Sequence, residues 1–269
     1  MSVIAIFRVD RREFAQMKRD PVYYSFCKSV LSRSPLFKGL ADPILDDMLS
    51  MFRRDTWRRG VQLDPAIFQQ RFFLLIEGRL EVMSINPQTG RSITLFLLGP
   101  GDGFDMVTLL DTHPHEVGSV AIDDVALISV PIQDARDWID RHPEFNRNFL
   151  RYLGMQMRQM EDLATDLALY DTLTRLARLI LRHVVPQYPQ AADGRYQLKL
   201  INDLHDESLA RMVGSVRQVV NRHLHHWREQ GILHKTKFRT EVAELQTLKE
   251  YATEVPSPAD QKAKIRPIH

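Results

Sequence analysis

Residues 204–233 read LHDESLARMVGSVRQVVNRHLHHWREQGIL, and this stretch has the pattern of two short helices joined by a turn. Apolar residues recur at helical spacing over residues 207–213. Gly214 predicts a left-handed turn after this helix, because glycine leaves a helix at positive φ without steric cost. Ser215 with Gln218 three residues later matches a capping box, so we expect Ser215 to cap a second helix. That helix is expected to bury Val216, Val219, Val220, Leu224 and Trp227.

The polar face of the second helix has the chemistry of a DNA-recognition helix. Its first turn carries Arg217 and Gln218, and this turn meets base edges in helix-turn-helix proteins. The basic segment 235–239 then predicts a short hairpin of the winged type. A purely structural helical hairpin is the alternative, but the cap, the glycine, the arginines and the basic segment together favour binding to double-stranded DNA. The predicted DNA-binding residues are Ser215, Arg217, Gln218, Asn221, Arg222, His225, Lys235 and Lys237.

The distribution of charge supports this interpretation better than the net charge does. The chain carries a formal charge of only +2. Residues 195–240, however, hold nine Lys and Arg against four Asp and Glu, a local charge of +5 that leaves −3 for the rest. A basic patch confined to one domain is expected of a protein that neutralises DNA phosphates.

Length and composition indicate a protein of two domains in a reducing compartment. At 269 residues, with about 150 residues per domain as a prior, two domains are expected. No run of about 18 apolar residues occurs and the N-terminus lacks a signal-peptide pattern, so we expect a cytoplasmic protein without a membrane partner. The single cysteine, Cys27, excludes an internal disulfide framework and an iron–sulfur cluster held by four cysteines of one chain.

Residues 55–130 have the pattern of an all-β unit. Strand-like segments at 71–76 and 79–85 meet at a Glu77-Gly78 turn, and further strands are predicted at 92–98, 118–122 and 126–130. Short strands separated by turns at intervals of 8–12 residues are typical of a sandwich or barrel. A strand is also predicted at 196–201, just before the helix-turn-helix.

A long helix is predicted from Pro143 onward. Apolar residues on it recur at alternating steps of three and four, as in the a/d seam of a coiled coil. A helix packed only on its own domain is the alternative, but a heptad seam between two domains favours a homodimer interface. The predicted interface residues are Leu150, Leu153, Met157, Met160, Ala164 and Leu167.

This order of elements resembles the CRP/FNR superfamily of bacterial transcription regulators, over residues 34–252. The segments that carry the resemblance are FLLIEG at 73–78, LGPGD at 98–102, DLA at 166–168 with RLA at 175–177, and LA at 209–210 followed by VG at 213–214 and Arg217. The resemblance implies an α+β fold with an N-terminal extension (1–33), a β-roll (34–142), a dimerisation helix (143–170), a winged helix-turn-helix (171–252) and a mobile tail (253–269).

The resemblance also implies a homodimer that binds a palindromic operator and, if it is an activator, contacts RNA polymerase. Base readout would be carried by Arg217, Gln218 and Arg222. Family members often have Glu at the second of these positions. Glu accepts a hydrogen bond from cytosine, whereas Gln can pair with adenine, so the half-site is expected to differ.

The predicted effector pocket lacks the family's cyclic-nucleotide motif. The residues assigned to it are Phe104, Asp105, Met106, His113, His115 and Glu116. Cyclic-nucleotide-binding members have a Phe-Gly-Glu turn and an Arg-Ser or Arg-Thr pair that holds the phosphate. Here the turn reads Gly103-Phe104-Asp105-Met106 and the pair reads His115-Glu116, so a phosphate would meet carboxylates without a fixed cation. Cyclic nucleotide binding is therefore not expected.

The identity of the effector stays open at this point. The cysteine and histidine of the family's haem-bearing carbon-monoxide sensors are absent, yet His113 and His115 keep haem as a possible cofactor. A solvated loop is the simpler interpretation of both histidines. A signalling module that acts through protein contacts is the alternative to a DNA-binding regulator. No nucleophile–base constellation, P-loop or dinucleotide motif predicts an enzyme.

Overall fold

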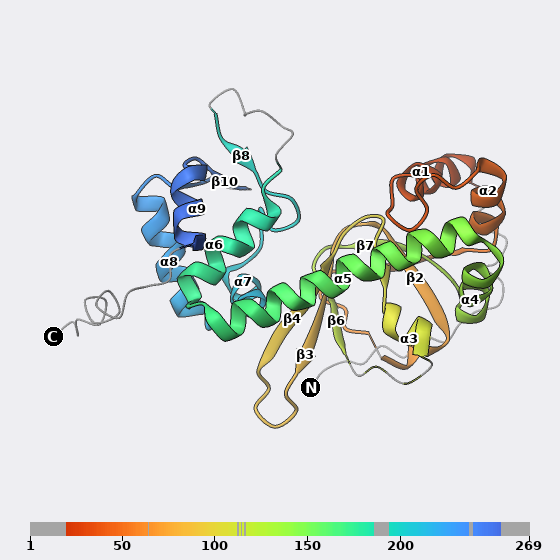
Figure 1. Ribbon diagram of the computed structural model, residues 1–269, viewed down its shortest axis with the longest axis horizontal. Helices are drawn as coiled ribbons and strands as arrows, with labels where there is room; N and C mark the ends of the chain where they lie inside the picture. Colours follow the sequence, from red (N-terminus) through yellow and green to blue (C-terminus); the bar gives the residue numbers. More distant parts are fainter. Residues whose placement is uncertain are drawn as a thin grey trace. The chain divides into compact units, whose positions relative to one another are not determined.

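The computed structural model describes residues 20–63, 65–111, 113, 115, 117–185, 194–236 and 239–253. The chain divides into two compact units (Figure 1). The first comprises Met1–Arg91 and Leu95–Met160, and the second comprises Ser92–Thr94 and Glu161–His269. Within the described residues, no helix is both long and apolar enough to span a bilayer.

Two antiparallel sheets form the β-roll of the first unit (Figure 1). One sheet has the order β1 (Arg53–Trp57), β7 (Val125–Pro131), β2 (Arg71–Glu77) and β5 (Gly103–Phe104). The other has the order β4 (Ser92–Leu98), β3 (Leu80–Ile85) and β6 (Gly118–Ala121). The strands predicted within 71–130 are therefore present, with bounds that differ by at most one residue at each end.

Strand β2 is buried on both faces, which explains its unbroken apolar sequence. Phe73 and Leu75 lie in the core of the β-roll, which also contains Trp57, Phe68, Leu80, Val82, Phe104, Val117, Val125 and Leu127. Phe72 and Leu74 point the other way, into a second core formed with the helices. Gly78 ends the strand at φ +82°, where a β-carbon would lie 2.7 Å from the carbonyl oxygen of Asp124.

Helices cover the outer face of this sheet. They are α1 (Pro21–Leu31), α2 (Asp42–Ser50), α4 (Ile132–Arg141) and the first part of α5 (Pro143–Leu169). Two shorter helices, η3 (Pro65–Gln69) and α3 (Met106–Asp111), connect the strands. Residues 1–33 were predicted to be an extension, yet Cys27, Val30 and Leu31 of α1 are buried in this helical core.

The second unit is a winged helix. It contains the end of α5, then α6 (Thr172–His183), α7 (Asp206–Met212), α8 (Arg217–Glu229) and α9 (Leu245–Thr253). Strands β8 (Tyr196–Gln197), β10 (Thr240–Val242) and β9 (Leu233–Lys235) form a small antiparallel sheet in that order. The strand predicted at 196–201 is thus only two residues long: Leu198 forms an isolated bridge with Val184, and Leu200 is left-handed at φ +68°.

A buried carboxylate fixes α6 to the end of α5. Asp166 is only 3% exposed and binds two guanidinium groups of α6. Arg178 Nε donates to Oδ1 at 2.5 Å, and Arg182 Nη2 lies 2.8 Å from Oδ2. Asp171 caps α6 by accepting a hydrogen bond from the Thr174 amide at 2.8 Å. Helix α6 is therefore held against the end of α5 by ion pairs as well as by packing.

Candidate functional site

Gly214 forms the turn between α7 and α8, as predicted, with φ +60°. The amide of Ser215 then donates to the carbonyl of Ala210 at 2.9 Å, and its hydroxyl lies 3.3 Å from Thr172 Oγ1. Val216 is extended (φ −108°, ψ 150°) and immediately precedes α8, without a side-chain cap. The prediction that Ser215 caps this helix is therefore wrong, because the chain enters the helix one residue later.

Helix α8 separates an apolar face from a polar one. Val220, Leu224 and Trp227 are buried, as predicted, whereas Val216 is 49% exposed and Val219 is only half-buried, contrary to the prediction. The polar face is exposed and consists of Arg217, Gln218, Asn221, Arg222 and His225. Both arginines of α8 are thus accessible from solvent.

Two residues of this polar face have partners within the protein. Asn221 Nδ2 donates to Asp206 Oδ2, across the helix-turn-helix. His225 Nδ1 lies 3.4 Å from a carboxylate oxygen of Glu229 on the same helix. Asp206 was not among the predicted DNA-binding residues, although it lies in the first turn of α7, the helix that precedes α8.

The wing follows α8 as the β9–β10 hairpin. Thr240 pairs with Lys235, and the amide of Thr236 donates to the Arg239 carbonyl at 2.8 Å. Lys235 and Arg239 are exposed. Lys237, the other predicted wing contact, lies outside the described residues.

The predicted seam of α5 divides into exposed and partly buried positions. Leu150 and Met157 are 61% and 65% exposed, and Ala164 and Leu167 are exposed as well. Leu153 is half-buried because it packs against the helical core of its own unit, and Met160 is also half-buried. The opposite face of the helix is buried in this core through Phe145, Phe149 and Tyr152. An apolar strip on α5 therefore remains uncovered in the single chain.

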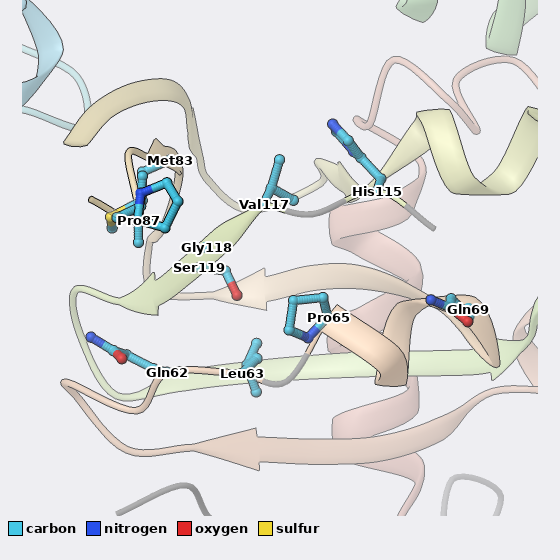
Figure 2. A pocket seen from close by; sticks show the side chains of 11 residues that line it. Gln62, Leu63, Pro65, Gln69, Met83, Pro87, His115, Val117, Gly118 and Ser119 are labelled. Atoms are coloured by element: carbon cyan, nitrogen blue, oxygen red, sulfur yellow. The ribbon is translucent and has the colours of Figure 1, made fainter. Parts of the chain in front are cut away.

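A half-open cavity of about 490 Å³ lies in the first unit, beside the start of β6 (Figure 2). Its walls come from the segment before η3, from η3 itself, from β3 with the turn after it, and from β6. The lining residues are Gln62, Leu63, Pro65, Gln69, Met83, Ile85, Pro87, His115, Val117, Gly118 and Ser119. None of these described residues carries a permanent charge, so the lining suits a neutral molecule better than an anion.

Of the five predicted effector residues that the structure describes, His115 alone lines this cavity. Phe104 belongs to the core of the β-roll and Met106 to the helical core, so neither is free to bind a ligand. Asp105 is left-handed (φ 54°), and its carboxylate accepts from or pairs with His115 Nδ1 at 2.9 Å. The prediction that Phe104, Asp105 and Met106 together line the effector pocket is therefore wrong. The backbone turns at Asp105, so the side chains on either side of it enter different cores.

Of the remaining two predicted effector residues, the structure describes His113. His113 has 83% of its side chain exposed and lies 3.7 Å from the Asp111 carboxylate. Glu116 lies outside the described residues. Within the part of the chain that is described, no group of three or more His, Cys, Asp or Glu side chains could hold a metal ion.

Two family models match the chain. A cyclic nucleotide-binding domain matches residues 67–142, and a Crp-like helix-turn-helix domain matches residues 174–251. The first range lies in the β-roll unit except for Ser92–Thr94, and the second lies in the winged-helix unit.

Two relatives illustrate the similarity over most of the chain. The cyclic AMP receptor protein of Thermus thermophilus is 30% identical over 224 residues, which cover 81% of this chain and 97% of that protein. The CRP-like cAMP-activated global transcriptional regulator of Mycobacterium tuberculosis is 25% identical over 206 residues, which cover 75% and 89%.

Solved structures share the fold. A mutant of CooA from Carboxydothermus hydrogenoformans aligns with a TM-score of 0.63 and 24% identity, covering 77% of this chain and 90% of that one. FixK2 from Bradyrhizobium japonicum aligns with a TM-score of 0.62 and 18% identity, covering 76% and 99%. At these identities the similarity concerns the fold alone.

Proposed function

Because this chain belongs to the CRP/FNR family of DNA-binding transcription regulators, we propose that it acts as a homodimer on a two-fold-symmetric operator and that its β-roll does not respond to cyclic nucleotides. The observation that carries the DNA-binding part is the polar face of α8. Arg217, Gln218 and Arg222 are all exposed there, on a helix whose other face is buried. Guanidinium groups pair bidentately with guanine O6 and N7 in the major groove.

The proposed dimer is supported by the apolar strip on α5. Leu150 and Met157, two turns apart, expose most of their side chains to solvent in the single chain. A second copy of α5 would remove this surface from water. In a symmetric dimer, two recognition helices meet half-sites about one helical turn, roughly 34–36 Å, apart. Dimerisation therefore doubles the phosphate contacts and sets the spacing of the operator.

The positions of Arg91 and Arg136, the arginines nearest in sequence to residues 111–117, support the proposal that cyclic nucleotides are not bound, because neither lines the cavity. Arg136 donates to the carbonyl oxygens of Leu109 and Thr108 at the end of α3, both at 2.9 Å. Arg91 is exposed in the turn between β3 and β4. A cyclic phosphate in the cavity of Figure 2 would meet no Lys or Arg among its described lining residues. Two relatives carry cyclic AMP in their names, so this chain would differ from them in its effector.

Three alternatives then remain for the β-roll: it binds a neutral effector, it binds haem, or it binds no ligand. His115 lines the cavity and is held through Nδ1 by Asp105, which leaves Nε2 as the ring nitrogen that could meet a ligand. A visible absorption spectrum of the protein as purified tests haem directly, because bound haem gives a Soret band. If the band is absent as purified, and absent again after incubation with haem and removal of the unbound haem, a neutral organic effector or none is left.

Selection from random duplexes tests the DNA-binding proposal. The full-length protein is incubated with random-sequence duplexes, bound DNA is sequenced, and the affinity of the selected duplex is measured at 50–200 mM salt. We expect a palindromic site and an affinity that falls steeply with salt, since each neutralised phosphate releases counterions. Failure to enrich any sequence, with weak binding that does not depend on salt, would instead favour action through protein contacts.

A further inference from the structure

Val216 places an exposed apolar side chain beside the polar face of α8. It is 49% exposed, and the next two residues, Arg217 and Gln218, are exposed as well. Among the described residues from Thr172 to Thr253, no other large apolar side chain is exposed. The winged helix therefore presents an apolar side chain to solvent directly beside an arginine that is proposed to read a base.

The fold does not require an apolar side chain at this position. Val216 is the N-cap of α8, and its carbonyl oxygen accepts hydrogen bonds from the amides of Val219 at 3.1 Å and Val220 at 3.2 Å. A side-chain oxygen at the N-cap stabilises a helix further, so Ser, Thr, Asp and Asn are preferred there. Valine provides no such cap and leaves half of its side chain in water. Its presence is therefore explained neither by capping nor by full burial.

The backbone around Val216 is held in place on both sides. Before it, the Ser215 amide donates to the Ala210 carbonyl at 2.9 Å, and the Ser215 hydroxyl lies 3.3 Å from Thr172 Oγ1. After it, α8 begins at Arg217. Valine is itself stiff, because its branched β-carbon restricts rotation about χ1. The two methyl groups are thus presented at a fixed place at the start of the recognition helix.

We propose that Val216 contacts the C5 methyl group of a thymine in each half-site and thereby selects thymine there. This inference rests on the proposed DNA-binding function and adds a base preference to it. The thymine methyl is an apolar group on the major-groove edge of a base, and apolar side chains are its natural partners. Consecutive α-carbons are about 3.8 Å apart, close to the spacing of about 3.4 Å between base pairs. The thymine is therefore expected close to the base pair that Arg217 reads.

The energy of this contact comes from apolar surface that is removed from water. Burial of one methyl-sized group contributes about 0.8 kcal/mol, which corresponds to about fourfold in affinity. Uracil lacks the C5 methyl group but keeps the O4 acceptor and the pairing with adenine. Exchange of a thymine for uracil therefore removes the proposed contact and leaves the hydrogen-bonding groups of the base pair in place.

The test replaces the thymines of the operator one at a time. The operator is first selected with the full-length wild-type protein. Each thymine of one half-site is then replaced by deoxyuridine, and the affinity is measured by fluorescence anisotropy at fixed salt. At one thymine we expect the wild-type protein to lose about three- to fivefold in affinity. Val216→Ala should lose less than about 1.5-fold there, because the contacting methyl groups are absent, and should respond like wild type at the other thymines.

Two further variants separate a base contact from a structural role. Val107→Ala makes the same change at a valine of similar exposure, 47%, in the other unit, and should keep the wild-type loss. Val216→Ser replaces the methyl groups with a hydroxyl that can cap α8. We expect it to lose the thymine preference as Val216→Ala does, with a melting temperature equal to or above that of wild type. A purely structural role predicts the reverse, a lower melting temperature with an unchanged thymine preference.

The inference is overturned if no exchange of thymine for uracil weakens the wild-type complex, or if Val216→Ala retains the full loss at every thymine. The second result would assign the methyl contact to another residue. Either result leaves the proposed DNA-binding function intact. A wild-type protein that selects no sequence at all would instead refute the proposed function, and this inference with it.

Discussion

Leu167, near the end of α5, lies so close to Gly214 in the helix-turn-helix that a β-carbon on residue 214 would be 2.6 Å from Leu167 Cδ2. Gly214 is thus required twice, by its positive φ of +60° and by this close approach. Gly231, with φ +74°, has no atom within 4 Å of the corresponding position. Substitutions at both glycines would cause backbone strain, but only a substitution at Gly214 would also cause a steric clash.

The first prediction is that Gly214→Ala destabilises the protein more than Gly231→Ala does. Both variants place alanine in a left-handed conformation, which costs about 1–2 kcal/mol. Only Gly214→Ala also displaces Leu167. Chemical denaturation of both variants measures the difference, and repeating Gly214→Ala in a Leu167→Ala background should remove the excess. Equal losses for the two glycine variants would show that the contact with Leu167 is without energetic effect.

The second prediction concerns the arginines of α8. Arg217→Ala and Arg222→Ala should each reduce the preference for the operator over scrambled DNA, because a bidentate contact with guanine contributes about 1–3 kcal/mol of discrimination. Competition binding at fixed salt measures the ratio. Arg33→Ala removes the same charge from an exposed site in the other unit and should leave the ratio unchanged. A wild-type ratio in either recognition-helix variant contradicts the proposed docking.

The third prediction is that a charge in the seam of α5 yields monomers. Met157→Glu places a carboxylate at a strongly exposed apolar position, which in the proposed dimer would face its symmetry mate. Replacement of Leu153 is less suitable, since that side chain also packs on its own core. Gln159→Glu introduces the same charge at an exposed position outside the seam and should remain dimeric. Sedimentation that shows one unchanged dimer for both variants would refute the interface.

The fourth prediction is that millimolar cyclic AMP and cyclic GMP leave the melting temperature unchanged. A ligand present at one hundred times its Kd would stabilise the folded state by about 2.7 kcal/mol, an easily measured shift. The expectation follows from the uncharged lining of the cavity and from the engagement of Arg136 by α3. A rise in melting temperature that disappears in His115→Ala would place a nucleotide in this cavity.

The fifth prediction concerns acid sensitivity of the second unit. Burial lowers the pKa of His183 to about 4, against which a hydrogen bond with the Lys199 backbone raises it. Since the unfolded state takes up the proton more readily, the stability is complete above pH 6.5 and falls as the pH decreases toward 4, by at most about 3 kcal/mol. Denaturation at pH 7, 6 and 5 should show a smaller loss in His183→Gln than in wild type. Parallel losses would exclude His183 as the cause.

Much of the fold could be predicted because local patterns decide it. Gly214 predicted its turn because glycine accepts a positive φ, and the strand at 92–98 was predicted because apolar residues lie there between two turns. The cap of α8 was not predictable, because Ser215 has the right chemistry but Val216 is the last extended residue. The capping residue is the last one before the helical backbone begins. Because α8 begins at Arg217, this residue is Val216, one position after the predicted Ser215.

The sites were less predictable where they depend on tertiary packing. Phe104 and Met106 are two residues apart, yet they enter the two different cores of the first unit. The pairing of Asp206 with Asn221 depends on the angle between α7 and α8, which no local pattern encodes. The exposed arginines, by contrast, followed from helical periodicity.

The position of Cys27 gives this protein a practical advantage for spectroscopy. The side chain is fully buried, and burial raises the pKa of its thiol to about 11, so little reactive thiolate is present at neutral pH. Since the chain has no other cysteine, one introduced at an exposed site such as Arg33 would be the preferred target of a maleimide or nitroxide reagent. Spin labels placed in this way would report the separation of the two copies in the proposed dimer, with and without DNA, while the native cysteine stays in place.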